Sequence, residues 1–311
     1  MHPHRLFRVE HFIKLIVKLS MEVKGKYSIK DLEVLSGIKA HTLRIWEQRY
    51  KLVVPYRTET NIRYYTDSQL KLILNIAALN NSGVKISKIA ELSKAEIGQK
   101  VLKLDNPELK NALLVNTLLE GMIELDKQKI LAVMHDSSKF NSLTEFFTSV
   151  VFPFLGKVGQ MWSSESINPA QEHFASNIIK RFLMEKIEKL EEPKPDAAMY
   201  LLFLPEGDWH ELSLLVAEYV LKKSGKKVMY LGASVPDKDI EKIVRLSTID
   251  FMLCVSILSQ PLSTTQETIN RFAKVANKVS VIFAGRSFYQ KELTFPSNCD
   301  VLYKFEELAE L

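Results

Sequence analysis

Residues 199–221 read MYLLFLPEGDWHELSLLVAEYVL, a pattern that indicates a β-strand, a loop and an α-helix in that order. The loop holds Asp208 and His210, and the helical run begins at Leu212. Open α/β sheets bind ligands in loops at the carboxyl ends of their strands. A carboxylate that accepts from one imidazole nitrogen orients a histidine for metal ligation. Alone, however, an acidic residue two positions before a loop histidine is more often chance than a site.

Four further apolar segments follow this strand and alternate with helical ones. The five strand candidates are residues 198–204, 228–231, 251–255, 279–283 and 301–303. This alternation predicts an α/β doubly wound, five-stranded parallel sheet of the flavodoxin-like type over residues 197–311.

Small residues follow the third and fourth candidate strands. Ser256 and Leu258 come after the third, and Ala284 and Gly285 after the fourth. We expect them to meet the loop of His210 at one edge of the sheet, because the carboxyl ends of parallel strands share an edge. Small residues let a bulky ligand approach the backbone, and the serine hydroxyl offers one hydrogen bond in an apolar slot.

The middle of the chain, residues 107–190, has only helical periodicity. Apolar stripes over residues 109–123, 126–134, 142–162 and 170–190 predict a four-helix bundle. Residues 191–196, EEPKPD, have the composition of a linker to the sheet domain.

A smaller helical domain is predicted over residues 26–98. Ser28 and Asp31 form a capping box at the start of a short helix, which Gly37 ends. A second helix is expected over residues 40–50, with Leu43 and Trp46 facing inward. Two short helices joined by a glycine-containing turn are typical of a helix-turn-helix. Residues 55–65 then predict a two-stranded wing, whose arginines and tyrosines suit phosphate contacts.

The charge of +5 is concentrated in this domain. From Lys39 to Arg63 the chain has six basic and two acidic residues. Such an excess suits a face that binds a polyanion, although on charge alone a solvated basic helix is the better explanation.

Composition excludes several protein classes. A hydrophobic share of 46% and a charged share of 25% in 311 residues are ordinary for a globular protein of two or three domains. Two distant cysteines, Cys254 and Cys299, predict no disulfide framework and favour a reducing, cytoplasmic location. Lys14 and Lys18 interrupt the apolar segment of the N-terminal extension, residues 1–25, so we expect neither a signal peptide nor a membrane span.

The N-terminal domain resembles the MerR family of winged-helix transcription regulators. The resemblance rests on residues 29–40 for the first helix and turn, residues 42–47 for the recognition helix, and Arg57, Asn61, Arg63, Tyr64 and Tyr65 for the wing. It implies binding to double-stranded promoter DNA. The implied contact residues are Thr42, Arg44, Arg57, Arg63 and Tyr64. No sustained heptad follows Ser93, so another part of the chain must supply a homodimer or homotetramer.

The sheet domain resembles the cobalamin-binding domain of methionine synthase and cobalamin-dependent mutases. The matching motifs are Asp-x-His-x-x-Gly, Ser-x-Leu and Gly-Gly, although Ser213 and Ala284 replace two of the glycines. The resemblance implies that His210 ligates cobalt, that Asp208 orients it, and that the cofactor slot includes Ser256, Leu258, Ala284 and Gly285. A pocket that has lost its ligand and serves only assembly is the alternative.

The helical region resembles the bundle of the CarH and LitR group of photoreceptor regulators, which caps the upper face of cobalamin. Trp162 is followed after nine residues by Glu172 and His173. The resemblance implies that these three residues contact the cofactor, whereas Trp162 by itself reads as a core residue. Light-responsive members commonly have a histidine directly after this tryptophan, where this chain has Ser163.

Together these features predict a multidomain transcription regulator, not an enzyme, with no catalytic residues. The resemblance implies that bound cobalamin, as adenosylcobalamin or methylcobalamin, controls assembly and DNA binding. Light sensitivity and repression by a tetramer are part of what the group implies. The alternatives are a corrinoid carrier or mutase subunit, and a regulator that has lost cobalamin.

Overall fold

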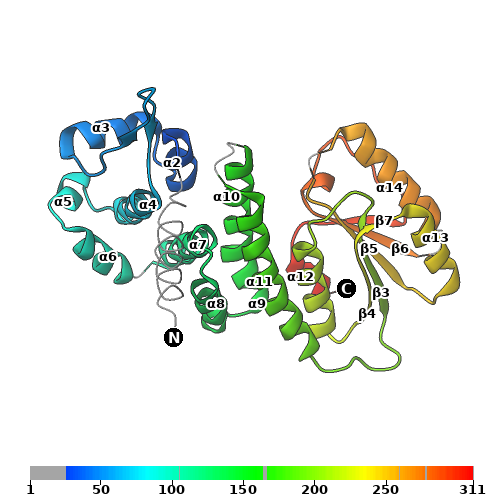
Figure 1. Ribbon diagram of the computed structural model, residues 1–311. Coiled ribbons are helices and arrows are strands. Elements are labelled where there is room, and N and C mark those ends of the chain that lie inside the picture. Colours follow the sequence, from blue (N-terminus) through cyan, green and yellow to red (C-terminus); the bar gives the residue numbers. More distant parts are fainter. Residues whose placement is uncertain (1–25, 105, 164–166, 259, 277–278, 311) are drawn as a thin grey trace, which may run out of the picture. The chain divides into compact units, whose positions relative to one another are not determined.

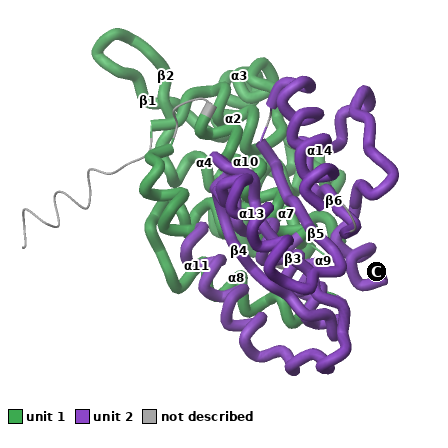
Figure 2. Tube along the Cα trace, turned by 90° about the vertical axis from the view of Figure 1, so that its right-hand side faces the viewer, with its two compact units in different colours: residues 1–140, 148–175 green, residues 141–147, 176–311 purple. Residues whose placement is uncertain are grey.

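The computed structural model describes residues 26–104, 106–163, 167–258, 260–276 and 279–310 (Figure 1). The expected N-terminal extension therefore lies outside the described residues. The chain divides into two compact units (Figure 2). The first joins residues 1–140 to 148–175, and the second joins residues 141–147 to 176–311. The division into four domains expected from the sequence remains a prediction.

The first unit begins with the expected helix-turn-helix. Its helices are α2 (Ile29–Ser36) and α3 (Ala40–Tyr50), and the Ser28–Asp31 capping box is formed. Gly37 ends α2 with a φ of 74°, a backbone conformation that favours glycine. A two-stranded wing follows, formed by β1 (Tyr56–Arg57) and β2 (Arg63–Tyr64), and then α4 (Asp67–Asn81), α5 (Ile86–Ala90) and α6 (Lys94–Leu102). The winged helix-turn-helix fold is thus confirmed.

The helical region that follows has helices α7 (Pro107–Ile123), α8 (Lys127–His135), α10 (Phe152–Ser163) and α11 (Pro169–Glu188). The helix expected over residues 142–162 is present over residues 143–163, but it is not a regular α-helix throughout. Short α9 (Leu143–Phe146) and a π-helical turn (Phe147–Val151) precede α10. Pro153 provides the physical reason, because it has no amide hydrogen and its ring would clash with the carbonyl four residues earlier in a regular helix.

Within the first unit, the winged helix packs directly on the helical region. Helix α7 contacts α4, α8 and α10, and α10 also contacts α2. Two polar links accompany this packing. Lys157 on α10 donates to the carbonyl oxygen of Leu35 at 2.6 Å, and Lys71 on α4 pairs with Glu120 on α7 at 2.7 Å.

The second unit holds the expected five-stranded parallel sheet. Its strands are β3 (Met199–Pro205), β4 (Lys227–Val235), β5 (Phe251–Val255), β6 (Ser280–Ala284) and β7 (Cys299–Leu302). Their spatial order is β4-β3-β5-β6-β7, so the flavodoxin-like, doubly wound topology is confirmed. The chain leaves β3 toward β4 on one side and returns to β5 on the other, which makes the β3–β5 edge the topological switch point.

Helices cover both faces of this sheet (Figure 1). Helix α12 (Leu212–Lys223) and the 3-10 helix η4 (Phe305–Ala309) share one apolar cluster with the sheet, and α13 (Asp237–Leu246) and α14 (Leu262–Ala276) share the other. Short 3-10 helix η3 (Arg286–Phe288) follows β6. In the described part of the chain, no helix is long and apolar enough to cross a membrane.

Candidate functional site

The loop after β3 holds His210 against a buried carboxylate. Nδ1 of His210 lies 2.9 Å from Oδ1 of Asp208, and the backbone amide of His210 donates to the same oxygen at 3.0 Å. Asp208 is fully buried, whereas 54% of the His210 side chain is exposed. A carboxylate accepts only, so Nδ1 carries the proton. A histidine fixed in this way can ligate a metal only through Nε2, which is the arrangement of many metal-ligating histidines.

The second oxygen of Asp208 is held from the neighbouring strand. Ser256, directly after β5, donates from Oγ to Oδ2 of Asp208 at 2.8 Å. Ser287 of η3 lies 3.0 Å from Ser256 Oγ and donates to the carbonyl of Leu258 at 2.5 Å. Burial alone would raise the pKa of Asp208, but the hydrogen bonds from His210 and Ser256 outweigh it and hold this pKa below its usual value. The carboxylate is therefore ionised at neutral pH.

Gly285 makes this arrangement possible. It has a φ of 100°, and a Cβ added there would lie 2.2 Å from the carbonyl oxygen of Ser256. No other residue fits without moving the backbone that carries the Ser256 side chain. Ala284, at the end of β6, and Ser213, in the first turn of α12, are both buried. The two departures from the glycine pattern are accommodated inside the second unit.

The residues expected to meet at the sheet edge do so in part. Asp208, His210 and Ser256 are in direct contact, and Gly285 packs on Ser256. Leu258 joins through its carbonyl, and Ala284 through the ladder hydrogen bond that its carbonyl accepts from Ser256 at 2.9 Å. The order of the strands explains this, because β5 lies between β3 and β6.

Sequence patterns missed a second set of polar groups beside His210. Glu211 accepts from the hydroxyl of Tyr230 on β4 at 3.0 Å and forms an ion pair with Lys180 on α11. Burial, followed by the charge of Glu211, raises the pKa of Tyr230 well above its usual value. The contacts with Tyr230 and Lys180 hold Glu211, the residue directly after His210, in place. No sequence motif predicts these contacts.

The aromatic and acidic residues of the helical region lie in the first unit. Trp162 lies in the last turn of α10 with 48% of its surface exposed, so it is not a core residue. On α11, Oε2 of Glu172 lies 2.9 Å from Nδ1 of His173, whose side chain is 68% exposed. The side chain of Ser163 lies outside the described residues. An exposed tryptophan and an exposed histidine provide a surface that a planar ligand can contact.

The winged helix presents a basic surface. Arg44 is exposed on α3 and Thr42 is half-buried, whereas Leu43 and Trp46 are buried as expected. In the wing, Arg57 and Arg63 are direct cross-strand partners, and the rings of Tyr56 and Tyr64 stack at 5.7 Å. Two like charges opposite each other are unfavourable without a counter-charge. This geometry suits contacts to the phosphates of a nucleic acid.

One charge in the wing is fixed internally. Arg57 donates to Oδ1 of Asn61 at 2.8 Å, and Asn61 itself sits at the turn of the wing with a φ of 62°. The asparagine side chain tolerates this left-handed conformation better than most residues. The turn therefore orients Arg57 before any ligand is bound.

Comparison with known proteins agrees with these features. Residues 27–96 match the MerR HTH family regulatory protein model, and residues 114–184 match the B12 binding domain model. The chain is 25% identical over 267 residues to the HTH-type transcriptional repressor CarH of Myxococcus xanthus. The aligned region covers 83% of this chain and 88% of that protein. The chain is 28% identical over 210 residues to the repressor CarA of the same organism, covering 67% and 68%.

Among solved structures, the chain is similar to the monomethylamine corrinoid protein of Methanosarcina barkeri. The TM-score is 0.48 at 14% identity, over 64% of this chain and 93% of that one. From the family models and the two repressors, the chain is a transcription regulator that joins a MerR HTH domain to a B12 binding domain and is homologous to CarH and CarA.

Proposed function

We propose that this regulator binds cobalamin with His210 as the cobalt ligand, and that the bound cofactor controls its assembly and its affinity for promoter DNA. The observation that carries the proposal is the half-exposed His210 imidazole held through Nδ1 by the buried, ionised carboxylate of Asp208. This donor set fits a metal that arrives with its other ligands already in place, as in a corrinoid ring.

The remaining residues of the sheet edge would position the cofactor. Asp208 orients the imidazole, Ser256 holds Asp208, and Gly285 keeps the backbone next to Ser256 accessible. Leu258 and Ala284 would line the slot. On the helical region, Trp162, Glu172 and His173 would contact the upper face of the cofactor, as the resemblance to the CarH and LitR group implies. Adenosylcobalamin or methylcobalamin would supply a cobalt–carbon bond that light can break.

Contacts within the first unit support a route from the cofactor to the DNA-binding helices. Trp162 and Lys157 lie on the same helix, α10, and Lys157 donates to Leu35 at the C-terminal end of α2. A cation there stabilises a helix through its dipole. Burial lowers the pKa of Lys157 below its usual value. A displacement of α10 on binding would therefore change the support of the helix-turn-helix.

Assembly would supply the second level of control. Several DNA-binding heads in one homotetramer raise the affinity for DNA through effective concentration. A ligand shifts such an equilibrium only if it binds the two states differently. We propose that the adenosylcobalamin form is a tetramer that represses in the dark, that the protein acts in the cytoplasm, and that it has no catalytic activity. A corrinoid carrier has no use for the exposed Arg44, Arg57 and Arg63.

The absorption spectrum of protein purified with hydroxocobalamin tests the cofactor. We expect a coloured wild-type protein, cofactor retention at least about tenfold weaker in His210→Ala, and no change in His135→Ala. His135 ends α8, far from the sheet in sequence, and is the matched control. A colourless wild-type protein would favour a regulator without ligand. An unchanged spectrum and affinity in His210→Ala would exclude His210 as the cobalt ligand.

Light is tested separately by size-exclusion chromatography. Protein loaded with adenosylcobalamin is run before and after green light, and we expect a shift from tetramer to a smaller species. An unchanged elution profile with the cofactor still bound would contradict the light switch while leaving cofactor binding intact.

A further inference from the structure

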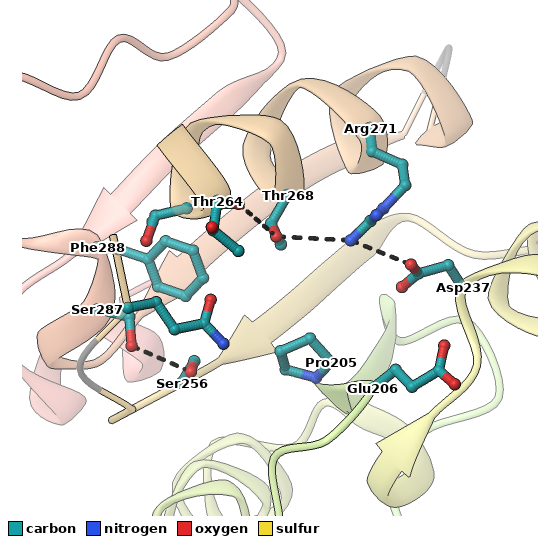
Figure 3. Close-up of a pocket in the computed structure, with 11 residues that line it drawn as sticks. Pro205, Glu206, Asp237, Ser256, Thr264, Thr268, Arg271, Ser287 and Phe288 are labelled. Atoms are coloured by element: carbon teal, nitrogen blue, oxygen red, sulfur yellow. Dashed lines mark hydrogen bonds and ion pairs between the residues drawn. The ribbon is translucent and has the colours of Figure 1, made fainter. Parts of the chain in front are cut away.

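A cavity of about 270 Å³ opens at the carboxyl edge of the sheet, between the ends of β3 and β5 and helices α13 and α14 (Figure 3). It lies at the topological switch point, the place where doubly wound sheets bind small molecules. Its lining is mostly polar and includes Glu206, Asp237, Arg271, Ser256, Ser287 and Phe288.

The two ends of the cavity differ in chemistry. Glu206, Asp237 and Arg271 lie at one end, and the hydroxyls of Ser256 and Ser287 lie at the other (Figure 3). The threonines of α14 form the wall between them, and two of these, Thr265 and Thr268, are buried together with both serines. Buried hydroxyls that face a cavity rather than packed side chains are suited to a polar ligand.

Asp237 provides the decisive feature. Its Oδ2 pairs with Arg271 at 3.0 Å, but its Oδ1 is buried and has no hydrogen-bond partner among the described residues. A buried oxygen without a donor costs free energy, and such groups in native proteins call for an explanation. The atom has almost no accessible surface, so a donor in the cavity reaches it only if the Asp237 side chain turns.

The charges of the lining define the sign of that ligand. Glu206 and Asp237 bring two negative charges, and Arg271 brings one positive charge. Burial raises the pKa of Asp237, Arg271 opposes this, and Glu206 raises it further. The acidic end therefore has a net formal charge of −1, which favours a cationic ligand over a neutral or anionic one.

The cavity is distinct from the histidine site. Neither Asp208 nor His210 lines it, and it lies on the α13 and α14 side of the sheet, opposite α12. Ser256 and Ser287 are shared, because Ser256 donates to Asp208 and Ser287 is hydrogen-bonded to Ser256, and both side chains also border the cavity. Binding in the cavity can therefore be tested in the protein without cobalamin.

We propose that this cavity binds a small primary amine that carries a hydroxyl or carbonyl group at its other end. The ammonium group has three donors and no acceptor, which matches the carboxylates of Asp237 and Glu206. The hydroxyl or carbonyl group faces the serine and threonine hydroxyls, and Phe288 provides an apolar wall for the carbon chain. A second site of this kind would make the regulator responsive to an amine as well.

Probes of similar size distinguish the charge requirement. The cobalamin-free protein is titrated with ethanolamine, propylamine, propionamide and propionate, and binding is followed by ligand-detected NMR. We expect ethanolamine to bind most tightly, propylamine more weakly, and propionate not at all. Equal binding of propionate and propylamine, or no binding of either amine, would overturn the proposal. Propionamide binding as tightly as propylamine would also overturn it, and would point instead to neutral amides such as those of a corrin ring.

Variants assign the binding to the cavity. Asp237→Asn keeps the size of the side chain but removes its charge, and we expect ethanolamine to bind about tenfold more weakly. Asp239→Asn is the matched control, because Asp239 lies in the same first turn of α13 but pairs with Lys242 on the surface. Glu206→Gln is the second variant, because Glu206 lies in an exposed loop and its substitution should not affect folding. We expect it to weaken ethanolamine binding as well, which keeps the test valid if Asp237→Asn does not fold. If both single variants fold and both bind ethanolamine as tightly as the wild type, this site is excluded. If only Glu206→Gln folds, unchanged binding in that variant excludes it.

Discussion

Asp208 and Asp237 lie at the same edge of the same sheet, yet their carboxylates differ in every respect that matters for binding. Asp208 follows β3 and accepts from His210 and Ser256, so both of its oxygens have donors. Asp237 begins α13 and pairs with Arg271, and its other oxygen is buried and has no donor within the part of the chain that the structure describes.

The pKa shifts of the two residues show which effect dominates. Asp208 is fully buried, whereas the side chain of Asp237 is 23% exposed, so burial alone would raise the pKa of Asp208 more. The reverse holds, because the pKa of Asp208 is lowered and that of Asp237 is raised. Hydrogen bonds to the charged form therefore outweigh burial at Asp208. The histidine site is complete in the protein alone, whereas the cavity still requires a donor.

Among the variants that disturb one of the two sites, Gly285→Ala is expected to have the largest effect on stability. The new Cβ would lie 2.2 Å from the carbonyl of Ser256, at a φ of 100°, and would displace the strand end that holds Asp208. The cost of a left-handed residue, about 1–2 kcal/mol, adds to overpacking of about 1–3 kcal/mol. We expect a loss of about 3 kcal/mol in the free energy of unfolding, measured by urea denaturation.

Gly207→Ala is the matched control for this substitution. Gly207 has a φ of 85° in the same edge of the sheet, but no atom lies within 4 Å of an added Cβ. Only the backbone term applies, so a loss of about 1–2 kcal/mol is expected. Equal losses at the two glycines would show that the close approach to Ser256 has no energetic importance.

A smaller effect, and one that differs between the two sites, is expected from the paired variants Asp208→Asn and Asp237→Asn. Asp208→Asn replaces charged hydrogen bonds with neutral ones and should cost about 2 kcal/mol of unfolding free energy. Asp237→Asn removes an incompletely neutralised charge and should leave stability within about 0.5 kcal/mol of the wild type, or raise it. A loss at Asp237 as large as that at Asp208 would contradict the comparison.

Much of the histidine site could be predicted from the sequence, because it depends on local order. Apolar runs locate the strand ends, and β5 has the bounds expected from its apolar run. Ser287 could not be predicted, since its contact with Ser256 depends on the positive φ of Gly285. The interruption before α10 had a signal in Pro153, but the periodicity on both sides of the proline concealed it.

The cavity could not be predicted for a different reason. Its charged residues come from the end of β3, the start of α13 and the third turn of α14, segments that only the strand order brings together. No motif includes Glu206, Asp237 and Arg271. An oxygen without a donor is a property of side-chain packing, and hydrophobic patterns carry no information on it.

The smallest expected effect is the pH dependence of these same variants, and its sign separates the two sites. The folded pKa of Asp208 lies below its usual value of 3.8. Its stabilisation is therefore present above that pH and is lost as the pH falls through the folded pKa. The folded pKa of Asp237 is raised, so its charged form opposes folding near neutral pH, and this penalty disappears on acidification.

The difference in unfolding free energy between the wild type and each asparagine variant should therefore become smaller as the pH falls. The wild type starts as the more stable protein in one pair and as the equal or less stable protein in the other. For Asp208→Asn the wild type is the more stable protein at neutral pH, and its advantage is lost as the pH falls below the usual carboxyl pKa and through the lower folded pKa of Asp208. For Asp237→Asn the variant is equal or superior at neutral pH, and the difference closes at a higher pH. Urea denaturation across this range measures both. A common sign would mean that the missing donor at Asp237 is supplied within the protein, and that the cavity has no need of a ligand.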